Sequence, residues 1–242
     1  FADDNVDAIY CAHGGGTAIE LLPHIDWENI KQHPKLFIGM SDIDVLHLSI
    51  HAKTGLVTFN GCDPKSGRDH DLDIPYNWEQ FHRRLLQGEK GIPASSPRTC
   101  VRSGTAQGKL LGCLAKGLLR LAGTPYLPDF DGAILFIEGF REDNKSFLGR
   151  LAQLRHMGIF DRIGGIVIGH IWGLQDEKLR EENNVVGTAE QMVLEATADY
   201  DFPILKTDDF GHYSSTCYLP IGGRVRIDAD AKTIEMVEDF VQ

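Results

Sequence analysis

Ser41 lies where a predicted strand turns into a predicted helix. Residues 34–38 read as a short buried strand, residues 39–42 as a tight turn, and residues 43–53 as a helix with one apolar face. A serine at such a bend directs its hydroxyl out at the carboxyl end of the sheet, and the backbone N–H of Asp42 would point at the oxygen of an attacked carbonyl. The pattern fits a nucleophile, but it matches the G-x-S-x-G elbow only in part. It also fits a serine that caps the helix beginning at Asp42.

Three consecutive glycines, Gly14, Gly15 and Gly16, follow a predicted strand at residues 7–12. Glycines let the backbone come close to a ligand and offer N–H groups to an anion. A phosphate or dinucleotide cradle would use the same feature, but the G-x-G-x-x-G pattern is incomplete and no acidic residue follows at the expected strand end. A donor to an oxyanion fits as well and needs fewer residues.

Glu138 and His212 could supply the acid and the base that a serine nucleophile needs. Glu138 ends a predicted strand at residues 133–137, and Gly139 after it keeps the carboxylate near a turn. His212 lies in a loop just past a further short strand, at residues 202–205. Nine other histidines compete for the role of base. Because strand-end carboxylates and loop histidines are often ordinary solvated residues, local pattern alone does not assign either of them.

The order of the expected elements indicates an α/β protein built from two domains. Strand–helix alternation in residues 1–92 predicts a parallel sheet of the Rossmann or flavodoxin kind, with residues 1–7 as the end of a helix. Residues 93–242 read as a mixed α/β domain, with a closing hairpin at residues 224–237. The polar stretch at residues 88–102 is interpreted as the crossing between the two domains.

The composition is that of an ordinary soluble globular protein of 242 residues, 42% of them apolar and 24% charged. A formal net charge of −11 argues against a nucleic-acid partner, because phosphate neutralisation needs clustered Lys and Arg. No apolar run approaches the ~20 residues of a membrane span, and no signal segment opens the chain. The five cysteines are scattered, and neither Cys nor His falls at metal-ligand spacing. We therefore expect a cytoplasmic protein with reduced thiols, no metal and no membrane partner.

Four ordered motifs resemble the LD-carboxypeptidase family of serine peptidases, which includes the microcin-immunity peptidases. Residues 13–26 are similar to the family's R-G-G-Y-G…L-L-P-x-L-D, and residues 34–43 to its P-K-x-F-I-G-Y-S-D-I, which carries the nucleophile. Segments within residues 123–138 resemble the part that ends in the catalytic glutamate, and segments within residues 210–222 the part with the catalytic histidine. The resemblance runs in order through nearly the whole chain.

This resemblance implies a two-domain enzyme with its active site at the domain interface. Ser41 would attack the scissile carbonyl, His212 would take and return the proton, and Glu138 would orient the imidazole and balance its charge. The N–H groups of Asp42 and Gly15 are the expected oxyanion hole.

The resemblance also implies a small peptide substrate with a terminal D-residue, no cofactor, and a homodimer. Gly14 and Gly16 are expected to contact the substrate. Trp172, which follows a predicted strand, could form a wall for a base or sugar, although a tryptophan in such a position is more often a packed structural residue.

The sequence departs from the family pattern in several places. Family members begin with one or more strand–helix units before the glycine segment, so we expect an N-terminal segment to be missing here. The family's arginine is His13, its aromatic residue is Gly16, and its G-G-N-L becomes residues 112–115. Gly139 stands where the family often has aspartate. None of these changes touches the three candidate catalytic residues, but each could alter substrate choice.

Three functions stay open from the sequence. The first is hydrolysis of an L,D-amide, such as release of terminal D-alanine from a murein tetrapeptide in peptidoglycan recycling. The second is a microcin-immunity type of peptidase that cleaves aminoacyl-nucleotide conjugates. The third is a catalytically silent relative that only binds peptides. Its affinity for a peptide would not change on loss of the Ser41 hydroxyl.

Overall fold

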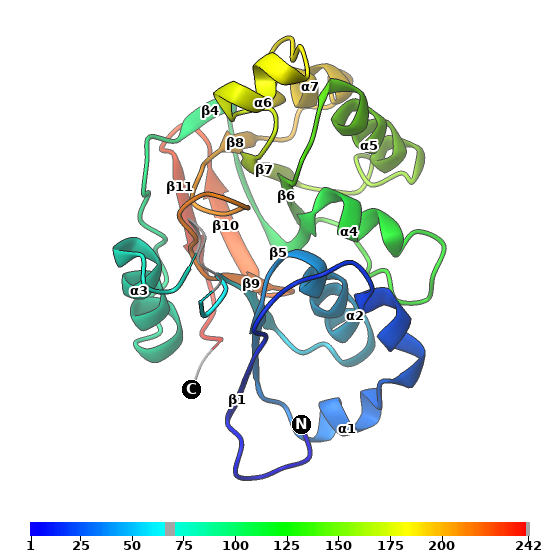
Figure 1. The fold of residues 1–242 in the computed structure, drawn as a ribbon, viewed down its shortest axis with the longest axis vertical. Helices are drawn as coiled ribbons and strands as arrows, with labels where there is room; N and C mark the ends of the chain where they lie inside the picture. The colour runs from blue at the N-terminus through cyan, green and yellow to red at the C-terminus, as the bar shows by residue number, and fades with distance from the viewer. Residues whose placement is uncertain (66–70, 241–242) are drawn as a thin grey trace.

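The computed structural model describes residues 1–65 and 71–240, which form two β-sheets surrounded by helices (Figure 1). The strands are β1 (Ala8–Tyr10), β2 (Leu36–Gly39), β3 (Thr58–Asn60), β4 (Thr99–Arg102), β5 (Thr105–Leu114), β6 (Ile134–Gly139), β7 (Gly165–Ile171), β8 (Ile204–Lys206), β9 (Leu219–Ile221), β10 (Arg224–Asp228) and β11 (Thr233–Met236). None of the helices in these two ranges is long and apolar enough to cross a membrane.

The α-helices lie mostly between the strands in sequence, as the strand–helix alternation predicts. They are α1 (Trp27–Gln32), α2 (Asp44–Thr54), α3 (Pro75–Phe81), α4 (Ala115–Arg120), α5 (Asn144–His156), α6 (Glu177–Glu182) and α7 (Ala189–Ala196). Two short 3₁₀ segments, η1 (Ala18–His24) and η2 (Ser41–Ile43), flank the first strands, and a π-helical turn, η3 (His82–Leu86), extends α3. The mixed α/β class expected from the sequence is confirmed.

The first sheet has the strand order β1-β2-β3-β9 and carries the turn that holds Ser41. β1, β2 and β3 run parallel, with Tyr10 opposite Ile38 and Ile38 opposite Phe59. α2 packs against β3 and ends at Gly55, whose φ of 76° is the left-handed conformation that a helix-terminating glycine adopts. The parallel sheet and the helix predicted around Ser41 are both present.

Both ends of the chain contribute to the first sheet. β9 pairs antiparallel with β3, so a strand from the last thirty residues completes a sheet that begins with residue 8. The predicted domain boundary between residues 92 and 93 stays a prediction. The helix end predicted for residues 1–7 is wrong: the segment contains a turn, in which the Asn5 N–H donates to the Asp3 carboxylate at 2.9 Å.

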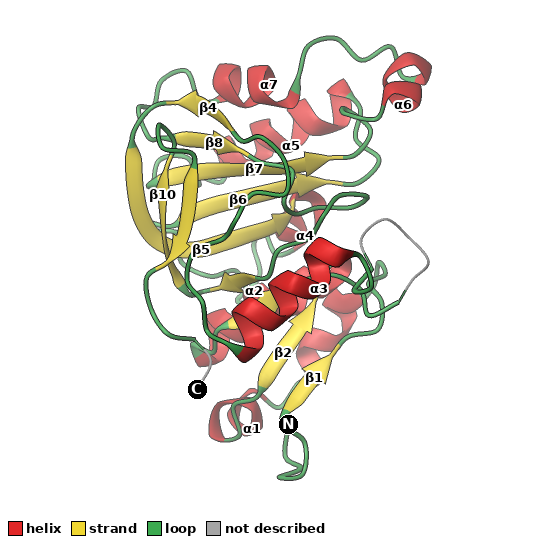
Figure 2. Ribbon diagram, turned by 90° about the vertical axis from the view of Figure 1, so that its left-hand side faces the viewer, coloured by secondary structure: helices red, strands yellow, loops and turns green. Residues whose placement is uncertain are grey.

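The second sheet has the strand order β11-β10-β5-β6-β7-β8-β4 and curls along its length (Figure 2). Its centre, β5 to β8, is parallel, while β10, β11 and β4 add antiparallel edges. Every residue of β6 is buried, because helices such as α4 and α5 cover the sheet. A continuous apolar run such as residues 133–137 is typical of a parallel strand that is buried on both faces.

His47, in the middle of α2, ties the end of β2 to β3. Its Nδ1 lies 2.8 Å from Thr58 Oγ1, and its Nε2 lies 3.0 Å from the carbonyl oxygen of Gly39. Because a carbonyl oxygen only accepts, Nε2–H donates to Gly39 and Nδ1 accepts from the Thr58 hydroxyl. Full burial lowers the pKa of His47 to about 4, since a charged ring would lose its hydration there.

Replacing His47 with glutamine should flatten the acid side of the stability profile. The folded protein favours the neutral ring, so its stabilisation is fully present above the ordinary pKa of 6.5 and is lost as the pH falls towards 4. The loss for wild type is roughly 3 kcal/mol in the free energy of unfolding. Glutamine offers a donor and an acceptor but does not titrate. Urea unfolding between about pH 4 and 7.5 should give a shallower decline for His47→Gln than for the exposed control His24→Gln, and equal slopes would contradict this.

Candidate active site

Ser41 lies at the tip of a strained turn between β2 and α2. Its φ of 66° is left-handed, a conformation that costs a residue with a side chain about 1–2 kcal/mol. Gly39 makes the turn possible, because a Cβ there would lie 2.7 Å from Ile43 Cγ2 and 3.0 Å from Cys11 Cβ. No side chain within the described ranges caps the start of η2 or α2, so Ser41 does not act as the helix cap that the sequence also allowed.

The structure brings Ser41, His212 and Glu138 into one hydrogen-bonded chain. His212 Nε2 lies 3.0 Å from Ser41 Oγ, and His212 Nδ1 lies 2.9 Å from Glu138 Oε2. A carboxylate only accepts, so Nδ1–H donates to Glu138 and Nε2 is left to accept from the Ser41 hydroxyl. His212 and Glu138 are each 3% exposed, so water scarcely competes for these bonds.

Glu138 and His212 reach this position from the carboxyl end of the second sheet. Glu138 is the penultimate residue of β6, and its neighbour on β5 is Leu114. The loop that carries His212 packs against the end of β7, where the His170 N–H donates to the Phe210 carbonyl at 2.9 Å. Gly211 has a φ of 119°, and a Cβ there would lie 2.8 Å from the His170 carbonyl oxygen. A glycine is therefore required directly before the histidine.

Asp209 anchors the start of this loop. Its carboxylate accepts a hydrogen bond from Arg98 Nε at 2.8 Å and forms an ion pair with Arg98 Nη2 at 2.7 Å. It also accepts from the Ser95 backbone N–H at 2.6 Å and from the Ser95 hydroxyl at 2.7 Å. Arg98 and Asp209 are both buried, so the pair has little competition from water. The stretch that the sequence suggested as a domain crossing, residues 88–102, thereby fixes the loop that ends in His212.

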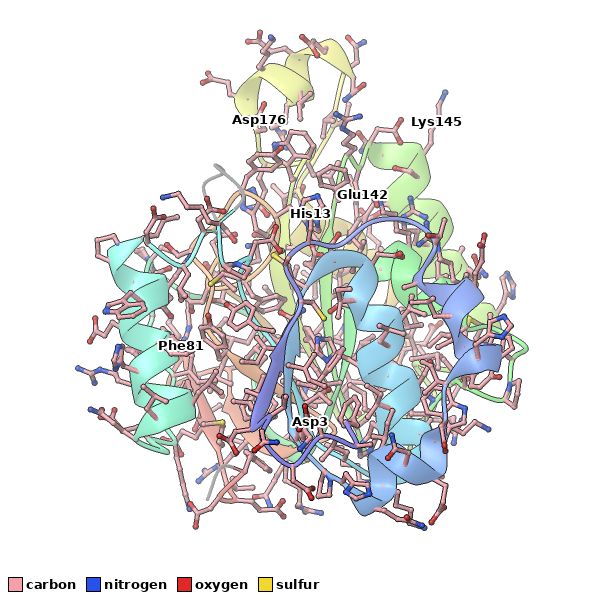
Figure 3. All side chains as sticks on the ribbon, turned by 60° about the horizontal axis from the view of Figure 1, so that its bottom comes forward. Asp3, His13, Phe81, Glu142, Lys145 and Asp176 are labelled. Atoms are coloured by element: carbon pink, nitrogen blue, oxygen red, sulfur yellow. The ribbon has the colours of Figure 1, made fainter. Side chains whose placement is uncertain are left out.

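The glycine segment lies against the turn that holds Ser41. A Cβ on Gly14 would lie 2.6 Å from Ser41 Cβ and 3.2 Å from the Asp42 backbone nitrogen, so only glycine fits there. The Asp42 carboxylate holds the segment in place, because it accepts from the Ala18 N–H at 2.7 Å and from Arg120. Asp3 lies before the amino end of β1, and His13 lies beyond its carboxyl end (Figure 3).

A cavity of about 180 Å³ opens beside the three residues. Gly14 and Gly15 line it, whereas Gly16 and Trp172 do not. The other lining residues include His13, which stands where the family has arginine, and three that the sequence did not single out: Asp63, Lys116 and Phe140. Asp63 Oδ2 lies 3.2 Å from His13 Nδ1. Lys116 and Asp63 do not belong to any sequence motif. Each reaches the cavity only because the fold brings together segments that are distant in sequence.

Trp172 lies in an aromatic cluster just outside the cavity. Its ring centroid is 4.5 Å from that of Tyr213 and 5.0 Å from that of Phe140, and Phe140 in turn lies 4.5 Å from the His212 ring. The Arg141 guanidinium lies over the rings of Phe140 and Trp172. Trp172 is half-buried, so it both packs and presents some surface next to the site.

Asp44 is a further buried carboxylate, behind Ser41, that the sequence did not indicate. It accepts from Asn60 Nδ2 at 2.6 Å and from the Leu114 N–H at 3.1 Å, and so joins β3 of the first sheet to β5 of the second. Burial raises the pKa of Asp44 well above its ordinary value, and the nearby charge of Glu138 adds to this. No group of three or more His, Cys, Asp or Glu that could hold a metal ion occurs among the described residues.

Comparison with known protein families gives a clear assignment. The model of the LD-carboxypeptidase N-terminal domain matches residues 1–61, and the model of the LD-carboxypeptidase C-terminal domain matches residues 107–227. The chain belongs to the LD-carboxypeptidase family. The resemblance expected from the sequence is thus confirmed. As a member of this family, the chain is a peptidase, a hydrolase of the carboxypeptidase type.

Individual LD-carboxypeptidase relatives agree with this assignment. A Bacillus subtilis protein named "Probable murein peptide carboxypeptidase" is 32% identical over 236 residues, which cover 96% of this chain and 72% of that protein. The microcin C7 self-immunity protein MccF of Escherichia coli is 25% identical over 268 residues, which cover 98% and 75%. The chain therefore spans about three quarters of the length of these relatives.

Solved structures of the LD-carboxypeptidase kind share the fold. The muramoyltetrapeptide carboxypeptidase of Oxalobacter formigenes superimposes with a TM-score of 0.78 at 26% identity, covering 97% of this chain and 78% of that one. MccF in complex with glutamyl sulfamoyl guanosine superimposes with a TM-score of 0.79 at 23% identity, covering 99% and 78%. The latter likeness shows the fold alone.

Proposed function

We propose that this protein is a serine carboxypeptidase that hydrolyses an L,D-amide bond, such as the one that holds the terminal D-alanine of a murein tetrapeptide. The observation that carries the proposal is the buried chain of hydrogen bonds from Ser41 through His212 to Glu138, open to a cavity of about 180 Å³. A serine with an oriented base is the arrangement that acyl transfer needs. The similarity to proteins named for murein peptides supports the substrate class.

The first half of the reaction forms an acyl-enzyme. His212 Nε2 accepts the Ser41 proton as Oγ attacks the scissile carbonyl carbon, and the imidazolium then gives that proton to the leaving amine of the D-residue. Glu138 keeps Nδ1 protonated and stabilises the imidazolium. In the second half, a water molecule takes the place of the amine, gives a proton to Nε2 and attacks the ester carbon. The bond from that carbon to Ser41 Oγ then breaks, the imidazolium returns the proton to Oγ, and the peptide leaves with a new carboxyl group.

The backbone N–H groups of Asp42 and Gly15 are our candidates for the oxyanion hole. Gly14 packs against the Ser41 side chain and lies close to the Asp42 nitrogen, so the glycine segment runs beside the carbonyl that Ser41 would attack. Loss of one such donor typically costs on the order of 3 kcal/mol in the transition state. The close approach of Gly14 to Ser41 and the hydrogen bond from the Ala18 N–H to the Asp42 carboxylate link the two segments that carry these donors.

A specific feature favours a second candidate function, cleavage of an aminoacyl-nucleotide conjugate. The half-buried rings of Trp172 and Tyr213, with Phe140 between them and His212, could stack against a base or sugar. Structures of MccF have been solved in complex with glutamyl sulfamoyl guanosine and with aspartyl sulfamoyl adenosine. Location in the cytoplasm, a role in peptidoglycan recycling and a homodimeric state stay predictions.

The two functions are distinguished by offering both substrates to the same preparation. We expect D-alanine release from UDP-muramoyl tetrapeptide, measured with a D-amino acid oxidase assay, and little cleavage of a glutamyl sulfamoyl nucleoside measured by chromatography. The opposite preference would favour the second function. A control peptide that ends in L-alanine should be a poor substrate, and equal cleavage of both stereoisomers would contradict the L,D specificity.

A further inference from the structure

Three side chains that line the cavity can carry a positive charge. Two of them already have a carboxylate partner, since His13 Nδ1 lies 3.2 Å from Asp63 and His212 Nδ1 lies 2.9 Å from Glu138. The third is Lys116, whose ammonium group has neither a hydrogen bond nor an ion pair with any residue in the described part of the chain. Within residues 1–65 and 71–240, the cavity therefore holds one cation, that of Lys116, to which no residue supplies a counter-charge by direct contact.

Lys116 is held in position by its place in the fold. It is the second residue of α4, which follows β5 directly, and its Nζ lies 4.7 Å from the centre of the Phe140 ring, another lining residue. Lys116 is half-buried, and this burial lowers the pKa of its ammonium, while the charge of Glu142 acts in the opposite direction. Glu142 itself is paired with Arg150 at 2.8 Å. A partly desolvated cation of this kind gains most from an anion that arrives with a ligand.

We propose that Lys116 binds the terminal carboxylate of the substrate, so that the enzyme cuts only the last residue of a peptide. This inference rests on the proposed peptidase function. In a peptide cut at its last residue, only the C–N, N–Cα and Cα–C bonds separate the scissile carbonyl carbon from the terminal carboxyl carbon, with lengths that sum to about 4.3 Å. The carboxylate must then lie in the same small cavity as the Ser41 hydroxyl, and Lys116 lines that cavity.

Two other roles for Lys116 predict different results. If it stabilised the oxyanion, its loss would slow the cleavage of every substrate, whatever the end group of the peptide. If it only packed on Phe140, methionine would replace it without effect, because the apolar length of the side chain is kept. Only a role in binding the terminal carboxylate predicts a loss of affinity that depends on whether the peptide ends in a carboxylate.

Measuring how substrate-like peptides bind to a variant that cannot cleave them distinguishes these roles. The probes are one tetrapeptide that ends in an L,D-amide, prepared as the free acid and as the C-terminal carboxamide, with affinities measured by calorimetry. Ser41→Ala protein should bind the acid about 10- to 100-fold more tightly than the carboxamide, the range for a hydrogen bond to a charged group. Adding Lys116→Met should abolish this preference by weakening acid binding alone, and Lys116→Arg should restore part of it.

Lys53→Met is the matched control, because Lys53 also lies over an aromatic ring, with Nζ 5.0 Å from the centre of the Tyr126 ring, but does not line the cavity. It should leave both affinities unchanged. The anchor is overturned if Lys116→Met keeps the preference for the acid, if both affinities fall equally, or if Ser41→Ala protein binds the two probes alike.

The failure of the anchor can be told apart from the failure of the peptidase function. D-alanine release by wild type, lost in Ser41→Ala, together with an acid preference that survives Lys116→Met, would overturn the anchor and leave the peptidase function standing. Acid binding that depends on Lys116, without any release by wild type, would support the anchor and contradict the proposed reaction.

Discussion

Replacing His212 with alanine is expected to lower kcat by on the order of 10⁴- to 10⁶-fold and to leave KM nearly unchanged. His212 Nε2 is 3.0 Å from the Ser41 hydroxyl and is the base that would take its proton. Its contribution arises in the transition state, where the proton moves, so its loss should change ground-state binding little. Steady-state release of D-alanine over a range of tetrapeptide concentrations gives both constants.

His156→Ala is the control for this experiment. His156 is exposed at the end of α5 and is not among the residues that line the cavity, so its kinetics should equal those of wild type. Thermal unfolding of both variants establishes that they are folded. A His212→Ala enzyme that keeps its kcat but shows a large rise in KM would contradict the role of base and make His212 a binding residue.

Glu138→Gln is expected to lower kcat by on the order of 10⁴-fold, although glutamine has the same shape. The Glu138 carboxylate accepts from His212 Nδ1–H at 2.9 Å and so keeps Nε2 unprotonated. An amide can turn its NH₂ group towards Nδ1, which places the ring proton on Nε2, where it can no longer receive the serine proton. The imidazolium that forms during the reaction also loses its counter-charge.

The variant Glu138→Asp separates the two contributions. It keeps the negative charge but withdraws the carboxylate by one methylene group, so it should retain more activity than Glu138→Gln and less than wild type. Asp44 has a raised pKa partly because of the charge on Glu138, so glutamine should leave the fold at least as stable as wild type near neutral pH. Wild-type rates in Glu138→Gln would contradict the proposed role.

The local elements of the site follow directly from the sequence. Residues 34–53 carry a strand, a turn and an amphipathic helix with a glycine at its end, and the structure has β2, η2 and α2 ending at Gly55. The apolar run before Glu138 likewise becomes the buried strand β6. These elements can be predicted because they depend on local signals, namely the spacing of apolar residues and the residues that form turns.

β5 shows why other elements could not be predicted in this way. It is central to the second sheet, yet it contains Gly108 and Gly112, residues that disfavour strands. Both are required by tertiary packing: a Cβ at Gly108 would lie 2.0 Å from the Gly132 carbonyl oxygen, and a Cβ at Gly112 would lie 2.0 Å from that of Phe136. The spacing of apolar residues along the sequence does not reveal that a neighbouring backbone will come this close.

The candidate nucleophile, base and acid were predicted because family motifs mark them, and the glycine segment beside them was also predicted, whereas Lys116, Asp63 and Phe140 were missed. Lys116 lies on an ordinary helical stretch, and Asp63 follows a cysteine in a polar segment. Their meeting in one cavity depends on how the two sheets lie against each other, and a carboxylate such as Asp44 contributes to that arrangement by bonding to β3 and β5 at once. Trp172, for which the sequence allowed either a substrate wall or a packed structural role, lies outside the cavity, in the aromatic cluster.

Release of D-alanine from UDP-muramoyl tetrapeptide, compared between wild type and Ser41→Ala, tests the central claim most directly. Ser41→Ala removes only the hydroxyl oxygen, and circular dichroism with thermal unfolding can establish that the variant is folded. We expect release by wild type and a loss on the order of 10⁴- to 10⁶-fold in Ser41→Ala, as for removal of the nucleophile in other serine hydrolases. Equal release by both proteins would contradict Ser41 as the nucleophile, and no release by folded wild type would contradict the proposed substrate.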